Sequence, residues 1–176
     1  GVLRIPGGVD PGVFRPAEDR AALRRRLDLP SGGPLLITVR NLVPRMGLDD
    51  LIRAMAVVTG EFPGATLLIG GEGPLRHDLE RLAEAAGVAR RTRFLGYVPE
   101  ERLPDLLAAA DLFVLPTRRL EGFGLVTVEA LACGTPVVGT PVGATPELLG
   151  PLGAGLLLPG VGPAALAGGI LARLRA

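Results

Sequence analysis

Two carboxylates, Glu121 and Glu129, stand eight residues apart around a glycine-bracketed turn, Gly122–Gly124, that is predicted to open a helix. None of the three turn residues is Ser, Thr, Asp or Asn, the types that normally cap the first amides of a helix. Those N–H groups therefore stay free to bind an anion such as a diphosphate. Glu129 follows about 7.5 Å further along the helix axis, where its carboxylate can accept hydrogen bonds from a sugar diol. Phosphate donors followed by a hydroxyl acceptor predict a site for a nucleotide diphosphate.

Each part of this pattern also has a plainer interpretation. A glycine-rich turn between a strand and a helix is most often a tight connection, and a lone helical Glu usually lies on a solvated face. The context favours a function, because the residues from Val126 to Ala132 are almost wholly apolar apart from Glu129 and predict a largely buried helix. A buried carboxylate is costly unless a partner satisfies it.

The elements that must position these residues follow from an alternation of short apolar runs with helical patterns. Alternation with short connections indicates βαβ units, and so an α/β fold with a Rossmann-like, doubly wound parallel sheet. Ligands of such sheets bind at the carboxyl ends of the strands, where Gly71, Gly73 and the turn at Gly122–Gly124 fall. The predicted strands are 35–39, 66–69, 93–95, 112–115, 136–139 and 155–158, and the predicted helices are 49–58, 74–86, 101–109, 125–132, 146–149 and 163–174.

Composition limits the class of protein. The 176 residues suffice for one domain with a normal core, and the net charge of +1 argues against a nucleic-acid binder. The single cysteine, Cys133, excludes an internal disulfide and indicates the reducing cytoplasm, and its apolar neighbours predict a core residue. No apolar stretch approaches a transmembrane span. Arg24–Arg26 are predicted to lie on the exposed face of an amphipathic helix, and His77 on a helix surface.

Two rival nucleotide sites are weaker. Gly71-Glu-Gly73 follows a predicted strand and precedes a helix, as in dinucleotide-binding proteins, but Arg76 stands where that fingerprint needs its third glycine. The sequence also has no Gly-Lys-Ser/Thr of the kind found in phosphate-binding P-loops.

The segment 119–138 resembles the Glu-x7-Glu motif of the retaining, GT-B-fold glycosyltransferases of family 4, also called the glycosyl transferases group 1 family. Further segments similar to that family cover nearly the whole chain in the family's order. They are Ile5–Asp10, Thr38–Gly47, Leu68–Pro74, Phe94–Val98 and Ala109–Pro116.

The resemblance implies that the chain is one half of a GT-B fold. Residues 1–16 would be an interdomain linker remnant and the start of the domain, and residues 17–176 the C-terminal domain that binds the nucleotide sugar. The N-terminal, acceptor-binding domain would be absent, so that the isolated chain would bind a UDP-, GDP- or ADP-linked hexose but transfer little. Peripheral membrane contact is expected only through that absent domain.

The resemblance also assigns residues. Arg40 matches a family arginine that meets the departing diphosphate, where a fixed cation is worth most because charge grows in the transition state. Met46 stands at the position of a family lysine, and its neighbour Arg45 is the expected substitute, with a planar fork suited to phosphate oxygens. Glu121 and Arg40 are the expected catalytic residues. The expected donor-binding residues are Arg45, Gly71, Gly73, Tyr97, Val98, Gly122, Phe123, Gly124, Leu125, Val126 and Glu129.

In this assignment Glu121 holds sugar hydroxyls, Glu129 holds the ribose, and Tyr97 and Val98 border the base. Gly7 and Gly8 match a family loop that faces the cleft. No metal site and no cofactor are expected, because the sequence lacks an Asp-x-Asp pattern and the pair Asp49–Asp50 is interpreted as first-turn acids of a helix.

Two alternatives stay open. The first is a non-catalytic nucleotide-binding or scaffold domain of the same fold, at which Met46 hints. The second, weaker alternative is a sugar-nucleotide epimerase, a group that lacks the linear Glu-Gly-Phe-Gly pattern present at Glu121–Gly124.

Overall fold

Five short strands form a single sheet in which every neighbouring pair is parallel, in the order β3-β2-β1-β4-β5. The structure is a computed structural model and describes residues 7–153 and 155–176. The sheet confirms the predicted α/β, doubly wound fold. The strands are β1 (Leu35–Val39), β2 (Thr66–Gly70), β3 (Thr92–Gly96), β4 (Leu112–Leu115) and β5 (Val137–Gly139).

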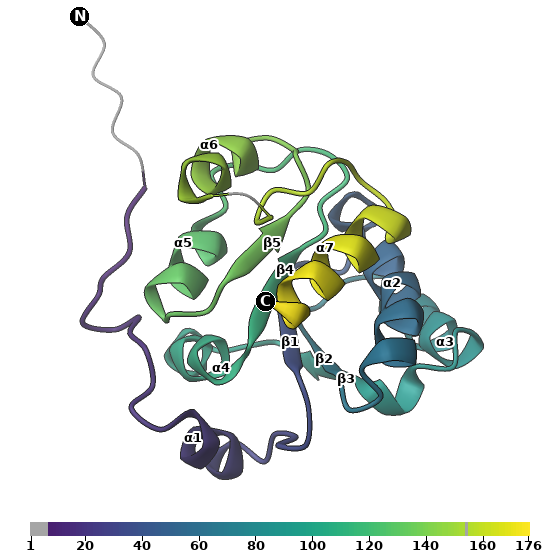
Figure 1. The fold of residues 1–176 in the computed structure, drawn as a ribbon, viewed down its shortest axis with the longest axis horizontal. Coiled ribbons are helices and arrows are strands. Elements are labelled where there is room, and N and C mark those ends of the chain that lie inside the picture. Colours follow the sequence, from purple (N-terminus) through teal and green to yellow (C-terminus); the bar gives the residue numbers. More distant parts are fainter. Residues whose placement is uncertain (1–6, 154) are drawn as a thin grey trace, which may run out of the picture.

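Helices cover both faces of the sheet. Figure 1 shows α2, α3 and α7 on one side, with α1, α4 and α5 on the other. No helix within the described residues is long and apolar enough to cross a membrane. The helices are α1 (Arg20–Arg26), α2 (Leu48–Glu61), α3 (Arg76–Ala85), α4 (Leu103–Ala109), α5 (Leu125–Ala132), α6 (Thr145–Leu149) and α7 (Pro163–Arg175), with short 3₁₀ turns η1 (Pro44–Met46), η2 (Ala89–Arg91), η3 (Glu100–Arg102) and η4 (Gly150–Leu152).

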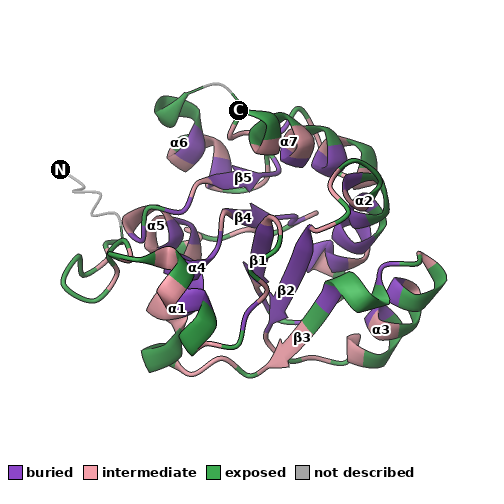
Figure 2. Cartoon of the chain, turned by 60° about the horizontal axis from the view of Figure 1, so that its bottom comes forward, coloured by how far each residue is buried: buried purple, intermediate pink, exposed green. Residues whose placement is uncertain are grey.

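The alternation of side chains along each strand divides the core in two. In β1, Leu36 packs in the cluster beneath α2 and α7, whereas Leu35 and Ile37 pack in the cluster beneath α4. All three side chains are fully buried, and burial of each stabilises the fold by about 1.5–3 kcal/mol. Figure 2 shows this buried band running through the central strands. A sheet buried on both faces explains why the strands read as continuous apolar runs.

The expected strand at residues 155–158 and the expected exposure of Arg24 were both wrong. The strand expected at residues 155–158 is reduced to one isolated bridge between Gly139 and Leu157, within a stretch that otherwise turns and bends. Arg24, expected on an exposed helix face, is only 8% exposed. Its guanidinium donates 2.8 Å to the carbonyl of Ala109 and lies 2.7 Å from the carboxylate of Asp111. That buried pairing ties α1 to the end of α4, whereas Arg25 remains exposed.

The strand order creates one position of special importance. The chain moves outward from β1 to β2 and β3, then returns to place β4 on the other side of β1. At such a switch point the connections after the two central strands run apart and leave a crevice. Arg40 directly follows β1, and the loop that ends in Glu121 follows β4.

Candidate functional site

Arg40 and Glu121 meet at the switch point between β1 and β4. Nη2 of Arg40 donates to Oε2 of Glu121, and both side chains are nearly inaccessible to solvent, at 6% and 7%. The hydroxyl of Thr117 donates 2.7 Å to the same carboxylate oxygen. Nη2 of Arg40 also lies 3.1 Å from the sulfur of Met46, whereas Nε of Arg40 is buried with no hydrogen-bond partner among the described residues. A desolvated donor without a partner is costly, which marks Arg40 as a group able to take a further acceptor.

The turn η1 carries Arg45 and Met46, the two residues that the sequence analysis grouped with Arg40. Met46 is buried, at 6% exposed, so an apolar side chain fills the position of the family lysine. Arg45 is half-buried, and its Nη1 donates 2.7 Å to the carbonyl of Leu120 in an exposed hydrogen bond. Leu120 has a left-handed backbone conformation (φ 59°) and directly precedes Glu121. The structure thus brings Arg45 to the Glu121 loop, with its guanidinium on a backbone oxygen.

A cavity of about 400 Å³ opens beside Arg40 at the carboxyl ends of the strands. Tyr97, which is 68% exposed, lines it from beyond β3, and Gly71 lines it from beyond β2. The backbone at Gly71 packs so closely that a Cβ there would lie 2.0 Å from the carbonyl oxygen of Arg40. The lining residues are Val39, Arg40, Asn41, Met46, Gly71, Glu72, Tyr97 and Val98.

The N-terminus of α5 opens onto the same region. Gly124 occupies the N-cap position in a left-handed conformation (φ 72°), and no side chain caps the helix. Oε1 of Glu121 and Oγ1 of Thr127 lie 3.8 Å and 3.4 Å from the point that a Cβ on Gly124 would occupy. The Thr127 hydroxyl is buried and has no hydrogen-bond partner within the described part of the chain. A Cβ on Gly7 would lie 2.9 Å from the Phe123 ring, so Gly7 borders this opening.

Glu129 lies on α5 beyond these amides. The expectation of a largely buried helix was wrong, because only Thr127 and Ala130 of α5 are buried and Leu125 is 50% exposed. Glu129 itself is half-buried. Burial raises the pKa of its carboxyl group above the ordinary range, and the nearby charge of Glu100 raises it further. The ionised form of Glu129 is therefore disfavoured, and a hydrogen bond donated by a bound group would stabilise it.

This raised pKa predicts a dependence of stability on pH. The folded protein binds the Glu129 proton more tightly than the unfolded chain does, so stability falls as pH rises from the ordinary carboxyl range through the folded pKa. Glu129→Gln removes that loss. In urea unfolding followed by circular dichroism without ligand, we expect the variant to be more stable than the wild type near about pH 7.5 and indistinguishable below about pH 4. An equal difference at both pH values would show that the ionisation of Glu129 is not responsible.

Arg118 is a residue of this region that the sequence did not single out. Its Nε donates 2.6 Å to Oδ2 of Asp50 and its Nη2 donates 2.7 Å to Oδ2 of Asp49. The two aspartates do lie in the first turn of α2, as expected, but their main partner is this arginine from the loop after β4. Only the adjacency of two acids could have signalled it, because their partner lies far away in the sequence.

Other groups are accounted for elsewhere. Cys133 is fully buried, and burial raises the pKa of its thiol to about 11, so the predicted core role is confirmed. The His77 side chain is 93% exposed, also as expected. A larger hollow of about 700 Å³ lies between the segment Gly12–Arg26 and α4, away from Arg40 and Glu121. In residues 7–153 and 155–176 no three His, Cys, Asp or Glu side chains gather in a metal-binding arrangement.

Comparison with known proteins gives consistent matches. The family model described as "Glycosyl transferases group 1" matches residues 19–175. The chain is 40% identical over 155 residues to a GDP-mannose-dependent monoacylated alpha-(1-6)-phosphatidylinositol monomannoside mannosyltransferase of Corynebacterium glutamicum, covering 84% of this chain and 40% of that protein. The chain therefore spans less than half the length of this curated relative.

Two solved structures share the fold. One is the C-terminal domain of a glycosyl transferase group 1 family protein (LpcC) from Francisella tularensis, with a TM-score of 0.84, 25% identity, and coverage of 96% of this chain and 89% of that one. The other is Anabaena Alr3699/HepE in complex with UDP, with a TM-score of 0.83, 27% identity, and coverage of 96% and 46%.

Proposed function

The chain belongs to the glycosyl transferases group 1 family, and we propose that it is the donor-binding, C-terminal domain of a retaining glycosyltransferase of family 4. The observation that carries the proposal is the meeting of Arg40 and Glu121 at the switch point, beside the uncapped start of α5. This arrangement offers a fixed cation, free amides and a carboxylate within one crevice. A nucleotide diphosphate sugar presents the complementary groups in the same order.

The diphosphate would lie between Arg40 and the first amides of α5, those of Leu125 and Val126. Arg40 supports this role because its Nε is buried without a partner, and a guanidinium fork can donate to a carboxylate and a phosphate at once. Arg45 would add a second cation by turning from the Leu120 carbonyl to a phosphate oxygen. The hydrogen bond from Arg45 to the Leu120 carbonyl is exposed to water, so replacing it with a bond to a phosphate oxygen would cost little free energy.

The sugar and the nucleoside would occupy the two ends of the crevice. Glu121 would accept sugar hydroxyls, with Gly122, Phe123 and Gly124 allowing a close approach. The Glu129 carboxylate would accept from the ribose diol, and Tyr97 and Val98 would border the base, with Gly71 and Gly73 shaping the adjoining floor. The name of the Corynebacterium relative favours GDP-mannose as the donor to test first.

In the proposed reaction the bond between the anomeric carbon and the diphosphate oxygen breaks, and the electron pair leaves with the diphosphate. An acceptor hydroxyl forms the new bond on the same face of the sugar and passes its proton to an oxygen of the departing diphosphate. Arg40 and the α5 amides would stabilise the leaving charge, which grows in the transition state. Acceptor binding and exclusion of water are assigned to a second domain, so we propose that residues 1–176 bind the donor without appreciable transfer. No metal ion is assigned a part.

A ligand panel tests the proposal directly. Purified protein is titrated with UDP, GDP, ADP and their sugar conjugates while its thermal unfolding is followed by circular dichroism. A ligand present at 100 times its dissociation constant stabilises the folded state by roughly 2.7 kcal/mol, which shifts the midpoint measurably. Binding of none of these ligands at millimolar concentration would reject the donor-binding function and favour a scaffold domain, for which the buried Met46 in place of a cation is the supporting observation.

Glu129→Gln separates recognition of the ribose from recognition of the phosphates. We expect affinity for the best nucleoside diphosphate to fall by about 1.5–3 kcal/mol, the worth of a hydrogen bond to a charged group. Affinity for inorganic pyrophosphate is expected to change little, because the phosphates would lie a turn away at the start of α5. Calorimetric titration measures both. Equal weakening of the two ligands would show that Glu129 does not contact the ribose.

A further inference from the structure

Glu121 stands at the end of a loop, residues 116–121, that has no regular secondary structure. We call this segment the Glu121 loop. A strand or helix would fix its own geometry through backbone hydrogen bonds, whereas this loop depends on contacts made by side chains and neighbouring backbone. The position of the Glu121 carboxylate therefore depends on whatever holds residues 116–121 in place.

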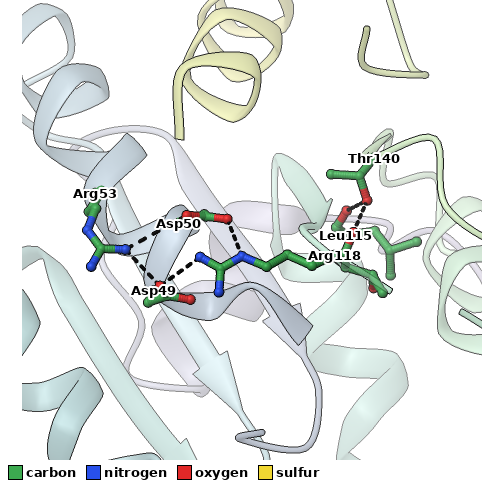
Figure 3. Close-up of polar contacts among 7 residues, drawn as sticks. Asp49, Asp50, Arg53, Leu115, Arg118 and Thr140 are labelled. Carbon is green, nitrogen blue, oxygen red and sulfur yellow. Dashed lines mark hydrogen bonds and ion pairs between the residues drawn. The ribbon is translucent and has the colours of Figure 1, made fainter. Parts of the chain in front are cut away.

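Three of these contacts are made by Arg118. Figure 3 shows its guanidinium lying between Asp49 and Asp50 at the start of α2, with Arg53 on the far side of the two acids. The backbone N–H of Arg118 donates 2.8 Å to the carbonyl of Arg45. One residue thus ties the Glu121 loop to the segment 45–50 through three hydrogen bonds.

A second support holds the loop from the other side. The Thr140 hydroxyl, which is fully buried, donates 2.6 Å to the carbonyl of Thr117. It also lies 3.4 Å from the carbonyl of Leu115, as Figure 3 shows. Thr140 fixes the start of the loop, where β4 ends, whereas Arg118 lies closer to Glu121.

The electrostatics make the Arg118 contact hard to replace. Asp50 is nearly inaccessible, with 7% of its side chain exposed, and the guanidinium of Arg53 comes no closer to it than 3.8 Å. Arg118 is therefore the close partner of a desolvated carboxylate. The Asp50 hydrogen bond raises the pKa of the Arg118 guanidinium, with Asp49 adding to it. Burial alone would raise the pKa of Asp49, but the hydrogen bonds of Arg118 and Arg53 outweigh it and lower that pKa. Arg118 and Asp49 are thus both held in their charged forms.

We propose that Arg118, gripping Asp49 and Asp50, is a positioning residue that fixes the Glu121 loop and so sets the place of Glu121 beside Arg40. The fork of Arg118 satisfies two carboxylates on one helix turn only while the loop stays in this register. The part of the inference that concerns the sugar rests on the proposed function. The part that concerns the loop does not.

The chain offers a matched control in Arg53. Its Nη1 donates 2.7 Å to the same Asp49 oxygen, but the pair spans one turn of α2 and does not reach the Glu121 loop. Arg53→Met therefore removes a cation from the same acids and leaves the loop contacts intact.

Three variants test the role of Arg118 itself. Arg118→Met removes the guanidinium and keeps the aliphatic stem. Arg118→Met/Asp50→Asn also neutralises the buried carboxylate, so that the protein folds even if the single variant does not. Arg118→Lys keeps a positive charge but lacks the planar fork that donates to the two acids from separate nitrogen atoms.

Hydrogen exchange reports the loop without any ligand. We expect amides in residues 117–124 to exchange at least about tenfold faster in the double variant than in the wild type, with intermediate rates for Arg118→Lys. Arg53→Met should exchange at the wild-type rate there. Unchanged exchange of residues 117–124 in the double variant, with the fold intact, would overturn the proposal.

Binding of GDP-mannose and of GDP reports the consequence for the site. We expect the double variant to lose about tenfold in affinity for GDP-mannose and less than about threefold for GDP, because Glu121 is assigned to the sugar. An unchanged ratio of the two affinities, despite faster exchange, would reduce Arg118 to a structural residue and overturn the proposal. If the wild type binds neither ligand while exchange responds as expected, the donor assignment fails and the positioning of the loop by Arg118 stands.

Discussion

Replacing Arg40 with methionine is expected to destabilise the protein by about 3–5 kcal/mol, because the change leaves the buried carboxylate of Glu121 without its cation. Arg40 and Glu121 are almost fully inaccessible, so water cannot take over the lost hydrogen bond. Only the Thr117 hydroxyl still donates to the stranded oxygen, according to the contacts of the described residues. Urea unfolding followed by circular dichroism measures the loss, and affinity for a nucleoside diphosphate should fall in the same variant.

The double variant Arg40→Met/Glu121→Gln provides the diagnostic comparison. It removes the charge on both sides, so most of the lost stability should return while ligand affinity stays low. Arg175→Met serves as a control, since Arg175 pairs with Glu61 on the exposed surface and its loss should change stability little. A double variant no more stable than Arg40→Met would show that packing, rather than the stranded charge, accounts for the cost.

Gly47→Ala is expected to cost roughly 2–5 kcal/mol, by two additive effects. Gly47 caps α2 in the left-handed region (φ 68°), where a side chain costs about 1–2 kcal/mol. A Cβ there would also lie 2.0 Å from the carbonyl oxygen of Pro116, at the start of the Glu121 loop. The backbone carbonyl of Pro116 cannot move aside as the end of a flexible side chain can, so overpacking adds about 1–3 kcal/mol of destabilisation. Unfolding in urea measures the sum.

Gly87→Ala isolates the first of these effects. Gly87 has nearly the same φ, at 72°, but a Cβ there would meet no heavy atom within 4 Å. It should therefore lose only the conformational part, about 1–2 kcal/mol. Losses of similar size at both glycines would mean that the segment after β4 moves aside from Gly47 without cost, and would contradict a tightly held Glu121 loop.

The local pattern of the sequence predicted most of the fold. The strands at 35–39 and 112–115 and the helix at 125–132 have the expected bounds. Strands β2 and β5 differ by one residue at one end, and β3 by one residue at each end. These elements are recognisable because apolar runs and glycine turns act over a few residues. The expected strand at 155–158 has the same apolar character, but it meets the sheet only through a bridge to Gly139, and pairing is decided by the neighbour rather than by the segment.

The sequence placed the expected site residues together at one candidate site, but it did not predict their contacts, and their role in binding a donor stays a prediction. Arg40, Glu121 and the glycine turn were expected together, yet nothing local indicates that Arg40 and Glu121 bind one another or that Arg118 grips Asp50. Each of these pairs joins residues that are far apart in the chain. Arg24 was placed on the wrong side of its helix for the same reason, since its partner Asp111 lies beyond α4. Charge pairing over such distances depends on the finished topology.

The pairing of Leu36 in β1 with Leu112 in β4 has a consequence for how the candidate site forms during folding. Joining these two strands closes a loop that contains α2, β2, α3, β3 and α4. Contacts so distant in sequence form slowly, because the entropy of loop closure is lost before the contacts form. Arg40 and Glu121 come together only when β1 and β4 pair. Chains halted before β1 and β4 pair would carry every local element of the first half and yet have no crevice, so the number of binding sites per molecule in a preparation would report the fraction of molecules that completed the sheet. A nucleotide that contacts residues on both sides of the β1–β4 pairing would in turn stabilise the completed sheet.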